Sequence, residues 1–278
     1  MGDPATTVIR SRANAAVRRF RARKEQGPDA ELLLIEGTKL LEEAVAAGLI
    51  VAEVAATPAA AQRARNAALL APLRSRRVPL RLVAEDVMAS LSEAETSQGV
   101  LALAHRPRFV EDDLFRGVPL VVVGVALQNP GNLGGLLRTA EAAGATGVWL
   151  TRGSADPLSW KALRGAMGSA FRLPHLAGSP LAEAERRLRA RGLPIVATTS
   201  AGGDPYDRAR LDGPMAVLFG NEGEGLPADL LARADRRVGI PLAGPVESLN
   251  VGVAAGVVLF EAARQRRAAA EPREVTRA

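Results

Sequence analysis

The chain has 278 residues, which corresponds to about two domains, each long enough to form a hydrophobic core without metals or disulfides. The absence of cysteine excludes disulfides, thiolate nucleophiles and iron–sulfur clusters, and two histidines are too few for a histidine-built metal site. The net charge of +6 and the isoelectric point of about 10.7 favour a polyanionic partner, with nucleic acid ahead of an anionic membrane surface.

No apolar run reaches the roughly 18 residues needed to span a bilayer. The N-terminus has no apolar segment of the kind found in signal peptides, and the lack of cysteine suits a reducing compartment. We therefore expect a cytoplasmic protein that binds neither a membrane nor a metal.

The first predicted element is a basic helix over residues 10–24. The segment carries seven positive charges and no acid, interleaved with alanines, Val17 and Phe20. Such a pattern is typical either of RNA binding or of a merely solvated surface helix. The residues expected to contact RNA are Arg10, Arg12, Arg18, Arg19, Arg21, Arg23 and Lys24.

Apolar runs and helical spacing then alternate up to Ala104, which predicts a small α/β unit. We expect strands over residues 32–35, 51–55 and 80–83, and helices over residues 39–47 and 59–70. Residues 106–117 contain a proline, mixed charges and no sustained period, and are interpreted as a linker. The predicted N-terminal domain is therefore residues 1–105.

The second half, residues 118–268, has the alternation typical of a parallel α/β domain. The apolar run over residues 120–127 indicates a central strand covered on both faces. Further strands are expected over residues 147–150, 194–199 and 215–219, and helices over 132–143, 160–170, 181–190, after Pro227 and over 248–267. The polar, basic residues 269–278 are expected to form a flexible tail.

Three glycine-containing loops follow apolar strands in this domain, at residues 128–140, 218–227 and 240–256. Loops at the carboxyl ends of strands bind ligands in open α/β sheets. The second loop also matches the dinucleotide fingerprint G-x-G-x-x-A at residues 223–228. That match is weak, because it lies late in the chain and has Pro227 at the expected helix start. A phosphate-binding P-loop motif is absent from the sequence.

Together the three loops resemble the motifs of the SpoU/TrmH-like branch of the SPOUT family of RNA ribose 2'-O-methyltransferases. The sequence has Asn-Pro-Gly-Asn-Leu-Gly at 129–134 followed by Arg-Thr-Ala at 138–140, Gly-Asn-Glu-Gly-Glu-Gly at 220–225, and Ile-Pro at 240–241 with Ser-Leu-Asn-Val at 248–251. Asn129 departs from the acidic residue of many members. Residues 32–44 and 91–104 look like the family's N-terminal substrate-binding domain, which is similar to ribosomal protein L30e.

The resemblance implies a C-terminal SPOUT domain with a trefoil knot and S-adenosyl-L-methionine as cofactor. Backbone atoms around Gly220, Ile240 and Leu249 would hold the adenosine part of the cofactor, with Thr198 or Thr199 at its edge. The implied catalytic residues are Arg138, Asn132, Glu222, Ser248 and Asn250.

The family's proposed base corresponds to Arg138, but a guanidinium rarely loses its proton. A cation that binds the target phosphate and stabilises a developing alkoxide is the role we prefer. Structural alternatives exist for the others: Ser248 is expected to cap the last helix, Asn132 is suited to cap the helix that carries Arg138, and Glu222 is suited to be a solvated loop acid.

Two further features of the catalytic half bear on partners. The spacing of Val253, Gly256, Val257 and Phe260 in the last helix fits core packing, whereas the resemblance implies a homodimer interface there. Aromatic residues make up 3% of the chain, so we expect RNA affinity to rest on phosphate contacts rather than on base stacking.

The function expected from the resemblance is 2'-O-methylation of RNA, with ribosomal RNA favoured because the full N-terminal domain is present. A tRNA methyltransferase and a non-catalytic RNA-binding or ribosome-assembly factor are the alternatives. The sequence does not determine the target nucleotide, or whether the role is housekeeping or antibiotic resistance.

Overall fold

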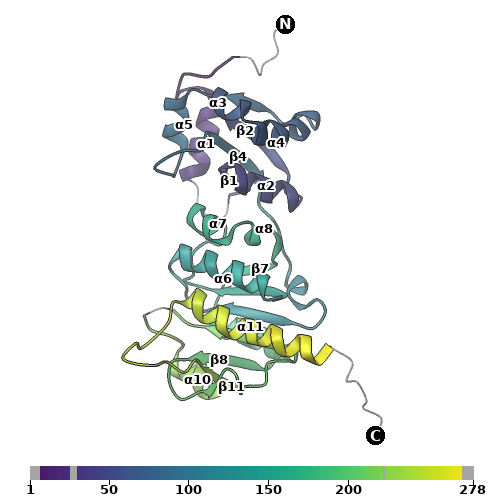
Figure 1. Ribbon diagram of the computed structural model, residues 1–278, viewed down its shortest axis with the longest axis vertical. Coiled ribbons are helices and arrows are strands. Elements are labelled where there is room, and N and C mark those ends of the chain that lie inside the picture. Colours follow the sequence, from purple (N-terminus) through teal and green to yellow (C-terminus); the bar gives the residue numbers. More distant parts are fainter. Residues whose placement is uncertain (1–6, 26–29, 222, 271–278) are drawn as a thin grey trace. The chain divides into compact units, whose positions relative to one another are not determined.

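The structure is a computed structural model that describes residues 7–25, 30–221 and 223–270 (Figure 1). The chain divides into two compact units. The first contains the residues up to Arg108 together with a later segment, residues 158–171, and the second contains the rest. Among the described residues, no helix is both long and apolar enough to cross a membrane.

The first unit has a four-stranded sheet in the order β1-β4-β2-β3. Strand β4 is antiparallel to both β1 and β2, and β2 is parallel to β3. Helices α1 and α5 pack on one face, where Val17, Phe20 and Met88 are buried against Leu101 and Leu103 of β4. The elements are α1 (Ala15–Glu25), β1 (Leu32–Glu36), α2 (Thr38–Ala46), β2 (Val51–Ala56), α3 (Pro58–Gln62), α4 (Ala64–Ser75), β3 (Leu80–Leu82), α5 (Glu85–Leu91), β4 (Val100–His105) and α7 (Trp160–Ala166).

The basic helix begins later than predicted. Asn14 ends the preceding turn, and its side-chain oxygen accepts a hydrogen bond from the Ala16 N–H at 2.9 Å, as expected of an N-terminal cap. Arg10 and Arg12 therefore precede α1. The preceding residue Ile9 forms an isolated parallel bridge with Val83, which ties this segment to the sheet.

Two predicted helices are interrupted. The helix expected over 59–70 is split into α3 and α4 at Arg63, whose backbone is extended, and the Asn66 side chain donates to the Ala60 carbonyl at the break. The helix expected over 160–170 ends at Met167, which has a left-handed backbone with φ 49°. A short helix, α8 (Ser169–Arg172), follows it.

The second unit has a seven-stranded sheet in the order β7-β6-β5-β10-β8-β11-β9. All of its strand pairs are parallel, which confirms the predicted parallel α/β domain. The elements are η1 (Glu111–Phe115), β5 (Leu120–Gly124), α6 (Pro130–Ala142), β6 (Gly147–Thr151), β7 (His175–Ser179), α9 (Leu181–Ala190), β8 (Ile195–Thr199), β9 (Asp204–Pro205), β10 (Met215–Phe219), α10 (Ala228–Arg233), β11 (Arg236–Gly239) and α11 (Val251–Ala270).

The predicted central strand forms and every residue of β5 is buried, but the strand ends at Gly124 rather than at the expected residue 127. One face of the sheet is covered by Ala184 and Leu188 of α9, Leu230 of α10 and Leu114 of η1. Helix η1 lies within the segment interpreted as a linker. Figure 1 shows α11, in yellow, running alongside α6, and these two helices pack against each other.

The C-terminal half of α11 is anchored by Arg266. Its guanidinium donates hydrogen bonds to the carbonyls of Val118 and Pro119, both at 3.0 Å, and of Gly213 at 2.6 Å. Burial lowers the pKa of this guanidinium. Of the tail expected over 269–278, residues 269 and 270 belong to α11, and the remainder lies outside the described residues.

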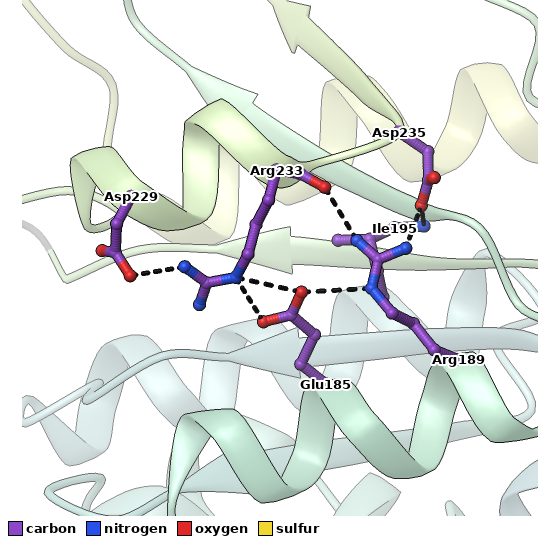
Figure 2. A network of polar contacts seen from close by, with 6 residues as sticks. All are labelled: Glu185, Arg189, Ile195, Asp229, Arg233 and Asp235. Carbon is purple, nitrogen blue, oxygen red and sulfur yellow. Dashed lines mark hydrogen bonds and ion pairs between the residues drawn. The ribbon is translucent and has the colours of Figure 1, made fainter.

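A polar network joins α9, α10 and the start of two strands (Figure 2). Buried Glu185 accepts hydrogen bonds from Arg189 and Arg233, and Arg189 also pairs with Asp235, which accepts from the Ile195 N–H. Glu185 is 8% exposed, so this carboxylate is matched by two cations rather than by water. The network fixes the elements that flank the loops described below.

Candidate functional site

The loops after β8, β10 and β11 meet at the carboxyl edge of the parallel sheet, where they form a cavity with part of α11. The cavity has a volume of about 360 Å³, within the range of small-molecule sites. Apolar side chains such as Leu226, Val238 and Leu242 contribute to its lining. The residues expected to bind a cofactor also line it: Thr198, Thr199, Gly220, Ile240 and Leu249.

Gly220 allows the second loop to fold back on itself. A Cβ atom at this position would lie 2.5 Å from the Gly225 oxygen and 2.6 Å from the Leu226 nitrogen, too close for any side chain. Asn221 fixes the same loop, because its side chain donates to the Ala126 carbonyl at 2.9 Å and accepts from the Gly223 N–H at 2.8 Å. The loop is therefore tied to the segment after β5 before any ligand binds.

Thr198 and Thr199 use their hydroxyl protons within the protein. Thr198 Oγ1 donates to the Leu218 carbonyl at 2.8 Å, and Thr199 Oγ1 donates to the Ala201 carbonyl at 2.7 Å. Their oxygens can therefore act toward a ligand only as acceptors, while the neighbouring backbone groups supply the remaining polar contacts.

The first and third motifs meet through two asparagines. Asn250 Nδ2 donates to Asn132 Oδ1 at 2.9 Å, although the residues are 118 positions apart in the sequence. Asn250 Oδ1 also accepts from the Gly252 N–H at 2.9 Å. One side chain thus caps α11 and links it to the first turn of α6.

The helix-capping roles considered for Ser248 and Asn132 are wrong. Ser248 does not cap the last helix, because α11 begins at Val251 and Asn250 occupies the capping position; Ser248 instead lines the cavity. Asn132 does not cap α6, because Asn129 does so, accepting from the Gly131 and Asn132 N–H groups at 2.8 and 3.2 Å. An asparagine at position 129 therefore supports the loop geometry well.

The structure does not place the other two expected catalytic residues, Arg138 and Glu222, in the cavity. Arg138 is exposed on α6 and is not among the residues that line the cavity. Glu222 lies outside the described residues. Two carboxylates that the sequence did not single out, Glu224 and Glu247, do line the cavity. Their position inside the second and third loops was the available signal.

The basic N-terminal residues divide into two groups. Arg10, Arg12 and Arg18 are exposed and Arg21 is half-buried, which suits a polyanion contact. The structure gives two others contacts within the protein. Arg23 is 9% exposed, and Arg19 donates hydrogen bonds to Glu53 from Nε at 3.0 Å and from Nη2 to both carboxylate oxygens at 2.8 Å. The side chain of Lys24 lies outside the described part.

Glu53 explains why Arg19 is held. This carboxylate is 5% exposed and also accepts a hydrogen bond from Arg81 at 2.8 Å, so it needs cationic partners inside the fold. Charge counting along the sequence could not distinguish this arginine, which is paired with a buried carboxylate, from its neighbours. Within the described ranges, no group of three or more histidine or acidic side chains could hold a metal ion.

Comparisons with known proteins identify relatives for both parts of the chain. Residues 119–260 match the SpoU rRNA Methylase family, and residues 14–102 match the MRM3-like substrate binding domain. The chain is 37% identical to an uncharacterized tRNA/rRNA methyltransferase of Synechocystis over 95% of this chain and 96% of that protein. It is 33% identical to the 23S rRNA (guanosine(2553)-2'-O)-methyltransferase RlmP of Bacillus subtilis over 85% and 90% of the two chains.

Solved structures are similar over nearly the whole chain. An RNA 2'-O ribose methyltransferase has 34% identity and a TM-score of 0.82, with 94% of this chain and 100% of that one covered. The SpoU methyltransferase AviRb of Streptomyces viridochromogenes, solved with AdoMet, has 28% identity and a TM-score of 0.82 over 91% and 98% of the chains. These matches, together with the three motif loops, show that the chain belongs to the SpoU rRNA methylase family.

Proposed function

We propose that this protein is an S-adenosylmethionine-dependent enzyme that methylates a ribose 2'-hydroxyl of ribosomal RNA. The observation that carries the proposal is the cavity built from the second and third motif loops at the carboxyl edge of the parallel sheet. Relatives such as RlmP, which is named for a guanosine of 23S rRNA, support the reaction and the substrate class. The N-terminal match to a substrate binding domain supports RNA as the partner.

The residues of the cavity fit the cofactor. Leu226, Val238 and Leu242 provide apolar contacts for an adenine ring, and the backbone around Gly220, Ile240 and Leu249 provides hydrogen-bonding groups. Glu224 and Glu247 give negative charge, which suits a ligand that carries a sulfonium and an ammonium group. When bound, S-adenosylmethionine supplies an activated methyl group, so no metal is required.

Arg138 serves in this proposal as a cation rather than as a base. A guanidinium stays protonated at neutral pH, so its role is to bind a phosphate beside the target ribose and to stabilise the developing alkoxide. The pair Asn132–Asn250 holds α6, which carries Arg138, against the start of α11. Ser248 would position the ribose or phosphate, and Glu222 would orient Arg138.

A homodimer through the C-terminal unit completes the proposal. Val253 and Phe260 of α11 are 54% and 48% exposed, and their spacing of seven residues puts them on one face of the helix. Exposed apolar residues in this arrangement favour a second copy of the chain as the cover. We also expect a trefoil knot in this unit, and a cytoplasmic protein, because ribosomal RNA is its substrate.

We expect RNA to contact Arg10, Arg12, Arg18 and Arg21. The first three of these arginines are exposed, and Arg21 is half-buried. Two alternatives remain open to experiment: a tRNA substrate, and RNA binding without turnover. A tRNA substrate is compatible with the Synechocystis relative, whose name covers both tRNA and rRNA.

The test is transfer of a labelled methyl group from S-adenosylmethionine to purified rRNA, ribosomal subunits and tRNA, followed by mapping of the modified ribose. Wild type is compared with Arg138→Ala and with Arg186→Ala, which removes an exposed arginine from α9. We expect one labelled rRNA nucleotide, lost in Arg138→Ala and kept in Arg186→Ala. Label confined to tRNA would establish that tRNA is the substrate. No label on any RNA would refute the proposed methyltransferase activity.

A further inference from the structure

A second cavity lies within the first compact unit. It has a volume of about 350 Å³ and is bounded by the junction of β1 and α2, by residues 94–98 and by α7. The residues that define its chemistry are Glu36, Lys39, Glu43, Gln98, Trp160 and Arg164. None of them belongs to the cavity of the second unit.

One wall of this cavity is a flat aromatic and cationic surface. The Arg164 guanidinium carbon lies 4.8 Å from the centre of the Trp160 ring, one turn away on the same helix. Aromatic rings and guanidinium planes are the surfaces on which unpaired RNA bases stack. This wall therefore suits a flat, uncharged ring.

The charges around the cavity are balanced. Lys39 pairs with Glu43 at 2.7 Å, and buried Glu36 accepts a hydrogen bond from the Glu93 N–H at 2.8 Å and another from the Ser92 hydroxyl. Two cations, Lys39 and Arg164, thus stand beside two carboxylates, Glu36 and Glu43. A site for a free phosphate would carry an excess of positive charge, and this one does not.

Another part of the lining offers hydrogen-bonding groups in a fixed position. Gln98 Oε1 accepts from the Thr38 N–H at 3.2 Å, and a Cβ atom at Gly37 would lie only 2.9 Å from that oxygen. Gly37 also has φ +94°, a conformation that favours glycine. With its oxygen so engaged, the Gln98 amide retains N–H donors, while Glu43 provides an acceptor.

We propose that this cavity binds one unpaired nucleobase of the RNA substrate, stacked on the Trp160–Arg164 wall and read by Gln98 and Glu43. The proposal rests on the proposed function, which makes RNA the ligand, and adds a base-binding site in the first unit. The low aromatic content leads us to expect RNA affinity from phosphate contacts rather than from base stacking. In this proposal, base stacking on Trp160 also contributes to RNA affinity, at this one cavity. The carboxylate of Glu43 favours a base that carries an amino group.

Tryptophan fluorescence provides a direct assay, because the chain has two tryptophans. Trp149 is 2% exposed, and its indole N–H donates to Ser179 at 2.6 Å, so Trp149→Phe leaves Trp160 as the reporter. We expect saturable quenching by unstructured heptanucleotides of adenosine or cytidine. Binding seen by anisotropy without any quenching would overturn the proposal, as would equal quenching by free adenosine monophosphate at the same concentration.

Two pairs of variants separate stacking from general electrostatics. Trp160→Leu should weaken binding of the heptanucleotide about tenfold, whereas Trp160→Phe should retain most of the affinity, because a phenyl ring still stacks. Arg164→Ala should weaken binding more than Lys161→Ala, which removes a charge from an exposed position of the same helix outside the cavity. Equal losses in Arg164→Ala and Lys161→Ala would refute a defined base site.

The outcome is distinguishable from failure of the proposed function. Methyl transfer by the wild type with no quenching of Trp160 would refute the base site and leave the enzyme intact. Saturable quenching without methyl transfer to any RNA would support the site and refute the enzyme.

Discussion

Replacing Gly220 by alanine tests whether the close approach within the second loop creates the cofactor cavity. The added Cβ would lie 2.5 Å from the Gly225 oxygen and 2.6 Å from the Leu226 nitrogen. Nonbonded heavy atoms need about 3.5–4.0 Å, so one arm of the loop must move by about 1 Å. Because both obstructing atoms belong to the backbone, a change of rotamer cannot relieve the clash.

The expected energetic effect of Gly220→Ala is about 1–3 kcal/mol, the usual range for overpacking. In a domain of this size each kcal/mol lowers the melting temperature by about 2–4 °C. The displaced loop should also reduce affinity for S-adenosylmethionine, and with it the increase in melting temperature that a bound ligand gives. Calorimetric titration and thermal unfolding with and without S-adenosylmethionine measure both effects.

Gly223→Ala is the matched control, since a Cβ there would meet only the Asn221 side-chain oxygen, at an ordinary 3.5 Å. It should bind S-adenosylmethionine nearly as wild type does. The reasoning would be refuted if Gly220→Ala bound the cofactor as tightly as wild type, or if the two variants lost affinity equally.

Four further predictions concern α6, α11 and the N-terminal segment. Asn250→Ala removes both the helix cap and the contact with Asn132, so it should lower stability by about 1 kcal/mol in thermal unfolding. Asn132→Ala should reduce methyl transfer but lower stability less than Asn250→Ala does. If the two variants lost the same stability, separate roles for Asn132 and Asn250 would be contradicted. A hydrogen-bonded arginine lowers the pKa of Glu261 from 4.5 to about 2, so its contribution to stability is present above pH 4.5 and lost toward pH 2. Glu261→Gln should therefore flatten the fall in the free energy of unfolding over that interval by less than about 1 kcal/mol, as measured by thermal unfolding at a series of pH values, and an unchanged slope would argue against this ion pair. Replacing Arg18 and Arg21 by alanine should reduce the salt dependence of RNA affinity, by up to about 0.7–0.9 per lost phosphate contact, without changing cofactor affinity; an unaltered salt slope would exclude these contacts.

In the second unit, the sequence identifies the strands that form buried apolar runs and misses the strands at the edges of the sheet. Strands β5 and β10 have five buried residues each, and their apolar runs identify them. Strands β7 and β11 contain glycine and polar residues, and β9 has two residues, so their sequences carry little strand signal. They form because neighbouring parallel strands provide hydrogen-bond partners along the edges of the sheet.

Local capping decided several boundaries that periodicity alone placed wrongly. Asn14 sets the start of α1, and Asn129 and Asn250 cap α6 and α11. Each of these asparagines precedes a helical pattern, so the signal was present in the sequence, but more than one polar residue competed for each position. Only the backbone path decides which side chain reaches the unpaired N–H groups.

The sequence by itself determined the α/β class, the apolar central strands, the three motif loops and the family, because these depend on residue type and on short, regular spacing. The tertiary structure decided which distant residues meet. It joined Asn132 to Asn250, turned Arg19 toward buried Glu53, and packed residues 158–171 with the first unit. The reason is that local patterns specify which face of an element is apolar, whereas the partner of a polar side chain depends on how the whole chain closes around it.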